Sequence, residues 1–568
     1  MVYRTNSIWS EESVNTRVAQ DALNRRVFMR LVGGAAAAAA AGVGIGGQAL
    51  GASLAQEAEP VAGGTLRIGL NAEPDTLDPH RTPSRYMWMV GLPMYDPLVI
   101  SDTTGAIYPS LATAWEISED QLTYTFTLRD DVMFHDGTPF NAEAVKYNYD
   151  RVVDPATGSL LSNDDIGPYE SSTVIDDYTV EVKLSAPYGP LLRMLSLMEF
   201  AIISPTAAES LGLEDYGFAP VGTGPFKFVE WTLQESTVFE KNPDYNWGAS
   251  DIYPITGAAY LDGIVYQYLV EAGTRIAALE NGEVDAITSV PPLEVARLEE
   301  SSDFTIEKYA ASGHPSAFIL NTSKPPTDDL NVRTAINLAM DREALVAALY
   351  DNQNDPAYGP LSPVTFGYWP EGPERWAFNP EEADRLLQES GWAKDGEYYQ
   401  KDGEPLTLEL YAFGTAGPTG EAVQAELRLS GIQVNVNILE FTEQKRITFE
   451  GLHNLCLITF GAPDPRILKL LYHSINMREE GWAWTKFLDS NPEVQAELDA
   501  ALDAGEQTSV PEERETHYFE AQRIINEYAL VLPVKNDYQI IGLSNRINGW
   551  QQDDANFHPR PYAVWLSE

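Results

Sequence analysis

Strand-like and helix-like patterns alternate along almost the whole chain, and this limits the fold to a mixed class. Residues 122–128 read Leu-Thr-Tyr-Thr-Phe-Thr-Leu, an alternation of apolar side chains and threonine typical of a strand buried on one face. Residues 379–391 begin with Asn-Pro-Glu-Glu and end with glycine, which predicts a capped helix. We therefore expect an α/β fold, neither a helical bundle nor an all-β sandwich.

Chain length adds a second limit. A single hydrophobic core stops growing beyond roughly 250–300 residues, and the chain has 568. We therefore expect two or more lobes. Further local predictions are a hairpin over residues 173–184 that turns at Asp176-Asp177, consecutive helices over 332–340 and 342–350, and a helix over 421–430.

Charge and cysteine content exclude several classes of protein. The chain has 84 acidic and 37 basic side chains and a formal net charge of -47, so we expect no nucleic acid as a partner. Cys456 is the only cysteine, which excludes an intramolecular disulfide and a cysteine metal cluster. The acidity favours either solubility in an exposed medium or attraction of cationic ligands, and net charge alone does not separate the two.

The first fifty-five residues have the pattern of an export address. Residues 24–30 read Asn-Arg-Arg-Val-Phe-Met-Arg, and a stretch dominated by alanine and glycine follows. This resembles a twin-arginine signal peptide, and Ser53-Leu54-Ala55 offers a small-x-small cleavage site. We expect a periplasmic or extracellular protein with a signal at residues 1–55. An uncleaved membrane anchor is the alternative.

Sequence motifs of catalysis are missing. The chain has no phosphate-binding glycine-rich loop ending in Gly-Lys, no HExxH zinc motif and no GxSxG nucleophile elbow. His135 and Asp136 are adjacent, but a turn between strand-like segments explains both. We therefore expect no enzyme, no catalytic residues, no metal and no cofactor.

From Gly63 onward several long segments resemble the extracellular solute-binding protein family 5, the peptide- and nickel-type receptors of ABC importers. The segments that carry the resemblance are residues 111–116, 128–140, 220–226, 242–245, 331–337, 379–392 and 463–465. The resemblance implies a two-lobed periplasmic-binding-protein fold of type II, with an extra subdomain in lobe one. By this analogy lobe one spans 60–310 with the subdomain near 104–219, lobe two spans 311–528, and residues 529–568 return to lobe one.

The resemblance also implies a mechanism and partners. A small-molecule solute (an oligopeptide, an oligosaccharide or a related compound) binds between lobes that close by hinge bending, and a monomeric receptor delivers it to ABC permease subunits in the membrane. Peptide receptors of this family hold the α-amine of the ligand with an Asp four residues before the second Pro of the Pro-Asp-Pro element. Position 461 is Gly here, so the peptide anchor is missing and the class of solute stays open.

Aromatic residues are the other expected ligand contacts, because aromatic faces stack on sugar rings or on apolar side chains. Core packing is the alternative for each of them. The residues expected to line the cleft are Arg85, Tyr86, Trp88, His314, Phe318, Phe413, Phe460, Gly461, Asp464, Trp482 and Trp484. An exported hydrolase on a similar scaffold remains a second hypothesis, and it would require a general acid and a general base facing each other across the cleft.

Overall fold

A computed structural model describes residues 59–567, except 83, 103–104, 160–161, 479–480 and 553–557, and the side chains of 415 and 441. Contacts divide the chain into two units, Met1–Glu59 and Pro60–Glu568, and the fold below is that of the second unit. The expected twin-arginine signal lies outside the described residues.

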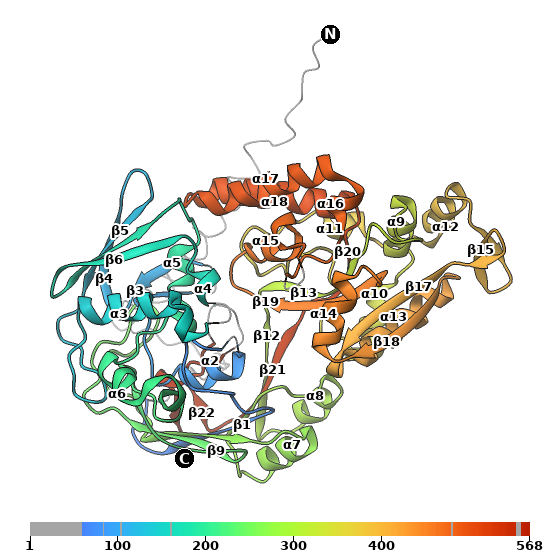
Figure 1. The fold of residues 1–568 in the computed structure, drawn as a ribbon. Coiled ribbons are helices and arrows are strands. Elements are labelled where there is room, and N and C mark those ends of the chain that lie inside the picture. Colours follow the sequence, from blue (N-terminus) through green and yellow to red (C-terminus); the bar gives the residue numbers. More distant parts are fainter. Residues whose placement is uncertain are drawn as a thin grey trace, which may run out of the picture. The chain divides into compact units, whose positions relative to one another are not determined.

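A seven-stranded mixed sheet forms the base of lobe one (Figure 1). Its spatial order is β12 (Phe304–Ala310), β21 (Tyr538–Ser544), β11 (Ala286–Ile287), β1 (Thr65–Leu70), β10 (Gly263–Tyr268), β9 (Ser236–Lys241) and β8 (Phe226–Thr232). β1 runs parallel to both of its neighbours, and the other pairs are antiparallel.

A five-stranded sheet forms the base of lobe two. Its order is β18 (Gln433–Leu439), β17 (Thr407–Phe413), β19 (Leu455–Gly461), β13 (Gly313–Leu320) and β20 (Val531–Lys535). Every residue of β13 is buried, and its successive side chains enter two different cores. Phe318 and Leu320 pack into one of them, and Ala317 and Ile319 pack into the other. Both faces of this sheet are therefore covered, as expected for a sheet with parallel strands inside an α/β lobe.

The chain passes between the two sheets twice, at residues 311–312 and at residues 536–537. The two passages are joined, because the backbone N–H of Ala311 donates to the Asp537 carbonyl at 2.8 Å. The Asp537 carboxylate also accepts from the Ser316 N–H and the Thr459 hydroxyl, each at 3.0 Å. This pair of connections is the feature around which two lobes can bend.

A four-stranded antiparallel sheet lies inside lobe one, in the order β4 (Ala112–Ile117), β5 (Thr123–Leu128), β7 (Thr179–Leu184), β6 (Tyr169–Asp176). The helix α3 (Ala142–Val153) lies against β6. The threonine-alternating strand is confirmed as β5, and the predicted hairpin is confirmed as β6 and β7. Its turn lies at Asp177-Tyr178, one residue later than predicted.

The helix predictions in lobe two are confirmed. Consecutive helices form at α9 (Leu330–Leu338) and α10 (Arg342–Tyr350), and α13 (Gly417–Leu429) covers the segment predicted at 421–430. The capped helix is α12 (Pro380–Glu389), where the Glu382 N–H donates to the Asn379 side chain at 3.1 Å. None of the helices in the described part of the chain combines the length and the apolar content that crossing a bilayer requires.

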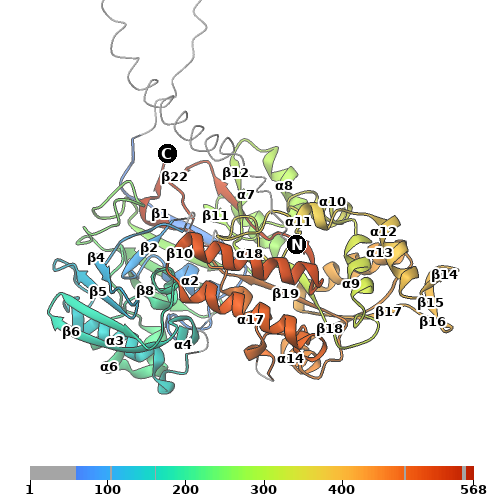
Figure 2. The same ribbon diagram turned by 90° about the horizontal axis from the view of Figure 1, so that it is seen from above.

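Two long antiparallel helices of lobe two, α17 (Pro492–Gln507) and α18 (Pro511–Glu527), extend toward the four-stranded sheet (Figures 1 and 2). The end of α17 and the loop that follows it contact lobe one directly. The Gly189 N–H donates to the Glu506 carbonyl at 2.7 Å, and the Ser509 N–H donates to the Gln121 side chain at 3.1 Å. The two lobes therefore touch at a point far in sequence from the paired connections.

Candidate functional site

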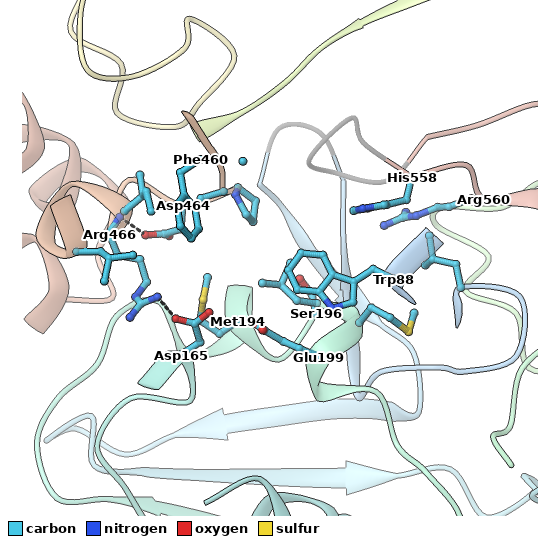
Figure 3. Close-up of a pocket in the computed structure, with 18 residues that line it drawn as sticks. Trp88, Asp165, Met194, Ser196, Glu199, Phe460, Asp464, Arg466, His558 and Arg560 are labelled. Atoms are coloured by element: carbon cyan, nitrogen blue, oxygen red, sulfur yellow. Dashed lines mark hydrogen bonds and ion pairs between the residues drawn. The ribbon is translucent and has the colours of Figure 1, made fainter. Parts of the chain in front are cut away.

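A cavity lies where the helix α2 (Arg85–Gly91) and residues 192–200 of lobe one face the end of β19 and the start of α15 (Ile467–Tyr472) of lobe two (Figure 3). It encloses about 880 Å³ outside the protein atoms, part of which is open to solvent. Its walls are mainly apolar, and they carry a few charged side chains. The lining residues are Trp88, Leu92, Asp165, Met194, Ser196, Leu197, Met198, Glu199, Phe460, Gly461, Ala462, Pro463, Asp464, Arg466, Ile467, Leu470, His558 and Arg560.

The indole of Trp88 is the largest aromatic surface that lobe one contributes. It projects from α2, and its edge meets the His558 ring with 5.8 Å between centroids. Its Nε1–H is buried and has no hydrogen-bond acceptor among the described residues. A buried donor without an acceptor costs stability, so this N–H is available to a bound molecule.

Lobe two presents the end of β19 and the loop after it. Phe460 and Gly461 end the strand, and Gly461 pairs with Gly313 on β13. Phe460 packs edge-on against Trp482 with 5.6 Å between centroids. With no side chain at position 461, this wall offers an apolar surface and backbone groups where the resemblance implied an anionic anchor.

Asp464 is committed to holding this loop in place. Its carboxylate accepts two hydrogen bonds from Arg514, at 2.8 and 3.0 Å, and one from the Arg466 N–H at 3.0 Å. Burial alone would raise the pKa of Asp464, but the charge and hydrogen bonds of Arg514 hold it below its ordinary value. Asp464 therefore lines the cavity while three hydrogen bonds tie its carboxylate to the protein.

An ion pair crosses the cavity between the lobes. The Arg466 guanidinium of lobe two hydrogen-bonds the Asp165 carboxylate of lobe one, which ends the short helix α4 (Ser162–Asp165). The same guanidinium lies 3.6 Å from the Glu506 carboxylate. Figure 3 shows this pair at one end of the cavity, away from Trp88. Both partners are largely buried, so removing either one would leave an uncompensated charge where the lobes meet.

Glu199 lies in the cavity wall with no cation as partner. It is the middle residue of the 3₁₀ turn η2 (Met198–Phe200), is fully buried, and receives no hydrogen bond from an N–H or O–H group of the described residues. Burial and then the negative charge of Asp165 raise the pKa of Glu199 well above its ordinary value, and Arg466 lowers it in part. These surroundings therefore favour the protonated form of the side chain, which can donate to Asp165.

Arg560 of lobe one is a buried cation without an anionic partner among the described residues. It is only 6% exposed, and its Nη2 donates to the Ser101 carbonyl at 3.3 Å. Its Nε is buried without an acceptor, and no carboxylate of the described residues forms an ion pair with it. Since guanidinium groups pair with carboxylates in bidentate geometry, Arg560 is a ready position for an anionic group.

The structure brings together four of the residues expected to line the cleft: Trp88, Phe460, Gly461 and Asp464. It places the other seven outside the cavity wall. Arg85 and Tyr86 hydrogen-bond each other at 2.9 Å, and Phe413 is the last residue of β17; none of the three is among the lining residues. Trp482 lies behind Phe460, with Lys445 Nζ 4.8 Å from its ring centre.

Three of those seven are interior residues. Phe318 belongs to a core of lobe two, because β13 is covered on both faces. Trp484 is buried, and its Nε1 donates to the Gly481 carbonyl at 3.2 Å. Both ring nitrogens of His314 are satisfied, by the Tyr472 hydroxyl at 2.8 Å and the Pro315 carbonyl at 2.9 Å, and burial lowers its pKa to about 4. His314 is therefore buried with both ring nitrogens hydrogen-bonded.

The charged groups Asp165, Glu199, Arg466 and Arg560 were not anticipated. Nothing in the local pattern around Glu199 or Asp165 distinguishes them from other acidic residues of this acidic chain. Arg466 directly follows the Pro-Asp-Pro element, so its proximity to Gly461 could have been used. No group of three or more His, Cys, Asp or Glu in the described part of the chain is placed to hold a metal ion.

The comparisons with known proteins agree with one another. Residues 106–476 match the family model of bacterial extracellular solute-binding proteins, family 5. The chain is 28% identical over 537 residues to di/tripeptide-binding protein 2 of Pseudomonas aeruginosa, which covers 89% of this chain and 94% of that protein.

Two solved structures are similar over nearly the whole described chain. NikA from Brucella suis, in complex with Fe(III)-EDTA, has a TM-score of 0.78 and 28% identity, covering 89% of this chain and 100% of that one. The ABC transporter-associated periplasmic binding protein DppA from Helicobacter pylori, in complex with the peptide STSA, has a TM-score of 0.72 and 26% identity, covering 89% and 99%.

Two lobes, two connecting passages and a cavity lined from both sides define a solute-binding protein of the type II periplasmic fold. The chain belongs to the bacterial extracellular solute-binding proteins, family 5. It is accordingly the substrate-binding component of an ABC importer, and the relatives give no support to a hydrolase.

Proposed function

We propose that the protein captures a small organic solute, peptide-like or oligosaccharide-like, in the cavity between its lobes and delivers it as a monomer to a membrane permease. Export by the twin-arginine route through residues 1–55 would bring it to the periplasm or the cell exterior. The proposed lobes are 60–310 and 311–528, with the C-terminal segment 529–568 returning to lobe one. β20 still pairs within the five-stranded sheet, so the return proper follows Lys535.

One observation supports capture between lobes more than any other. The cavity wall is built from both lobes, and the Arg466–Asp165 ion pair links them across it. A ligand that binds such a composite site stabilises the closed arrangement over the open one by the difference in its affinity for the two. A permease can then distinguish the closed surface from the open one.

The class of solute is supported from two directions. The names of relatives refer to di/tripeptides and to glutathione, which favours a peptide-like compound. Gly461 removes the amine anchor that the resemblance implied, and the apolar faces of Trp88 and Phe460 suit a sugar ring as well as an apolar side chain. Both classes therefore belong in the test.

We propose further that the bound solute leaves chemically unchanged. The two neighbouring carboxyl groups, Asp165 and Glu199, both come from lobe one, and Asp165 is occupied by Arg466. A hydrolase would need an acid and a base placed on opposite sides of the scissile bond.

The test is a screen of the purified protein against dipeptides, tripeptides and short oligosaccharides by thermal shift and intrinsic fluorescence. A true ligand is expected to raise the melting temperature, change the tryptophan emission to which Trp88 contributes, and reduce the radius of gyration in solution scattering. Arg466→Gln is expected to weaken binding, whereas Arg446→Gln, on the exposed face of α14 (Phe441–Phe449), serves as the matched control. Ligand recovered as a cleavage product would contradict the absence of chemistry. Failure of every compound to stabilise the protein would contradict capture itself.

A further inference from the structure

The cavity contains two buried ionisable side chains that have no counter-ion among the described residues. They lie on opposite sides of Trp88 (Figure 3). Glu199 has no cation for its carboxyl group, and Arg560 has no carboxylate for its guanidinium. Groups of this kind are costly to bury alone, and a bound molecule that supplied their counter-ions would offset that cost.

We propose that Glu199 and Arg560 hold the two charged ends of a zwitterionic solute, and that Glu199 loses one proton when the solute binds. This inference rests on the proposed function, because it names the chemistry by which the same cavity holds its ligand. The solute carries a carboxylate at one end and an ammonium or guanidinium group at the other. Its middle part lies over the apolar surface of Trp88.

Formal charge within the cavity supports a zwitterion. Asp165 and Arg466 neutralise each other, as do Asp464 and Arg514. We count Glu199 as protonated and leave His558 out. The charge that remains is that of Arg560, so the cavity carries one net positive charge before a ligand binds. A zwitterion adds no net charge, so release of the Glu199 proton brings the occupied cavity to neutrality, which a low-dielectric site favours.

The proton balance follows from the neighbours of Glu199. In the empty cavity a protonated Glu199 can donate to the Asp165 carboxylate. A ligand ammonium that reaches Glu199 supplies N–H donors and a positive charge, which favour the ionised carboxylate. The O–H bond of Glu199 breaks, its electron pair stays on the carboxylate oxygen, and the proton leaves to solvent. No other covalent bond changes, and the ammonium takes the place of the proton beside the two carboxyl groups.

The cations around Glu199 have other partners. On lobe one, the helix α2 carries Arg85, which pairs with Tyr86, and α3 carries Arg151, which is paired with Asp78. On lobe two, the charge of Arg466 acts on Glu199, but its Nη1 hydrogen-bonds Asp165 and its Nε is buried without a hydrogen bond. Among the described residues no cation therefore forms an ion pair or a hydrogen bond with Glu199.

The anionic end of the ligand is assigned to Arg560 on the same reasoning. Its Nε–H is buried without an acceptor while its Nη2 is held by the Ser101 carbonyl, so the guanidinium is oriented before the ligand arrives. A carboxylate that accepts from Nε and a second nitrogen would complete it. The apolar walls from Met194, Leu197 and Leu470 favour a ligand with an apolar side chain between its charged ends.

The experiment is isothermal titration calorimetry of the purified protein with three dipeptides, alanyl-leucine, alanyl-phenylalanine and leucyl-alanine, at pH 7. Each is used with free ends, as its N-acetyl derivative and as its C-terminal amide. Titrations in buffers of different ionisation enthalpy give the number of protons released. A free dipeptide is expected to bind with release of about one proton. The acetylated and amidated forms are expected to bind at least about 30-fold more weakly.

Variants assign each end. Glu199→Gln keeps the shape of the side chain, and it is expected to abolish proton release and to reduce the preference for the free amine over the acetylated form. Arg560→Gln is expected to equalise the affinities of the acid and the amide. Glu209→Gln and Arg546→Gln, at exposed positions of lobe one, are the matched controls. Melting curves verify folding, and Glu199→Gln is expected to melt no lower than the parent protein because it removes no hydrogen bond from an N–H or O–H donor.

The outcomes separate this inference from the proposed function. If an acetylated dipeptide binds as well as the free one, or if binding releases no proton, the assignment of Glu199 is wrong while capture stands. If oligosaccharides such as maltotriose stabilise the protein and no dipeptide does, the zwitterion is wrong and capture again stands. If no compound of either kind binds, both are overturned.

Discussion

Replacing Gly189 with alanine is expected to hold the lobes apart without disturbing either one. Gly189 lies where the end of α17 and the loop after it touch lobe one, and its N–H donates to the Glu506 carbonyl. A Cβ at this position would lie 1.8 Å from the Thr508 carbonyl oxygen and 2.6 Å from its carbon. Both of these are backbone atoms, so no side-chain rotation relieves the overlap.

The size of the effect follows from that contact. The overlap removes a hydrogen bond worth about 1 kcal/mol, and it adds a steric penalty of about 1–3 kcal/mol, comparable with overpacking in a core. A closed arrangement destabilised by about 2–4 kcal/mol corresponds to a ligand affinity lowered roughly 30- to 1000-fold. Each lobe keeps its own core, because the contact lies between them.

Solution scattering and ligand titration measure both parts of this prediction. Gly189→Ala is expected to keep the larger radius of gyration of the open protein at ligand concentrations that compact the parent. Gly257→Ala is the control, since a Cβ there has open space around it. Unchanged affinity together with normal compaction in Gly189→Ala would show that this contact is not part of the ligand-bound form.

Three further predictions concern stability and reactivity. Asp464→Asn leaves the buried Arg514 without its carboxylate and is expected to lower the free energy of unfolding in urea by about 3–5 kcal/mol. An equal loss in the control Asp489→Asn, at an exposed position, would show that the ion pair is not the cause. The folded-state pKa of His314, about 4, lies below its ordinary 6.5, so its contribution is complete above pH 6.5 and is lost as the pH falls toward 4. Relative to His314→Gln, the parent is therefore expected to lose about 3 kcal/mol more stability over this range, and parallel stability curves would refute the assignment. Burial raises the pKa of the Cys456 thiol, so a thiol reagent is expected to label it only after denaturation; rapid labelling of the native protein would contradict this.

Local elements could be predicted from the sequence because their causes are local. The strand β5 and the helix α12 each follow from a few adjacent residues, a period-two alternation in one and a cap with proline in the other. The strand β13 shows the limit of such patterns. It is buried on both faces, so no alternation distinguishes Phe318 in the core from a residue that faces the cleft.

The site was only half predictable for a related reason. Gly461 and Asp464 could be placed because they belong to a recognisable sequence element. Asp165 and Arg466 are 301 residues apart, and only the meeting of two lobes makes them partners. Glu199 is distinguished by its burial without a cation, a property of packing that no spacing of residues reveals.

The position of β21 has a consequence for the order in which the protein is made. This strand, residues 538–544, lies inside the seven-stranded sheet between β12 and β11, and it pairs with both. The ribosome delivers it after all of lobe two, so a nascent chain holds lobe one with open strand edges until nearly the end of synthesis. A chain truncated before residue 538 would retain those edges and invite aggregation or proteolysis. Because β21 is synthesised late, the seven-stranded sheet is complete only in a receptor whose synthesis has passed this strand.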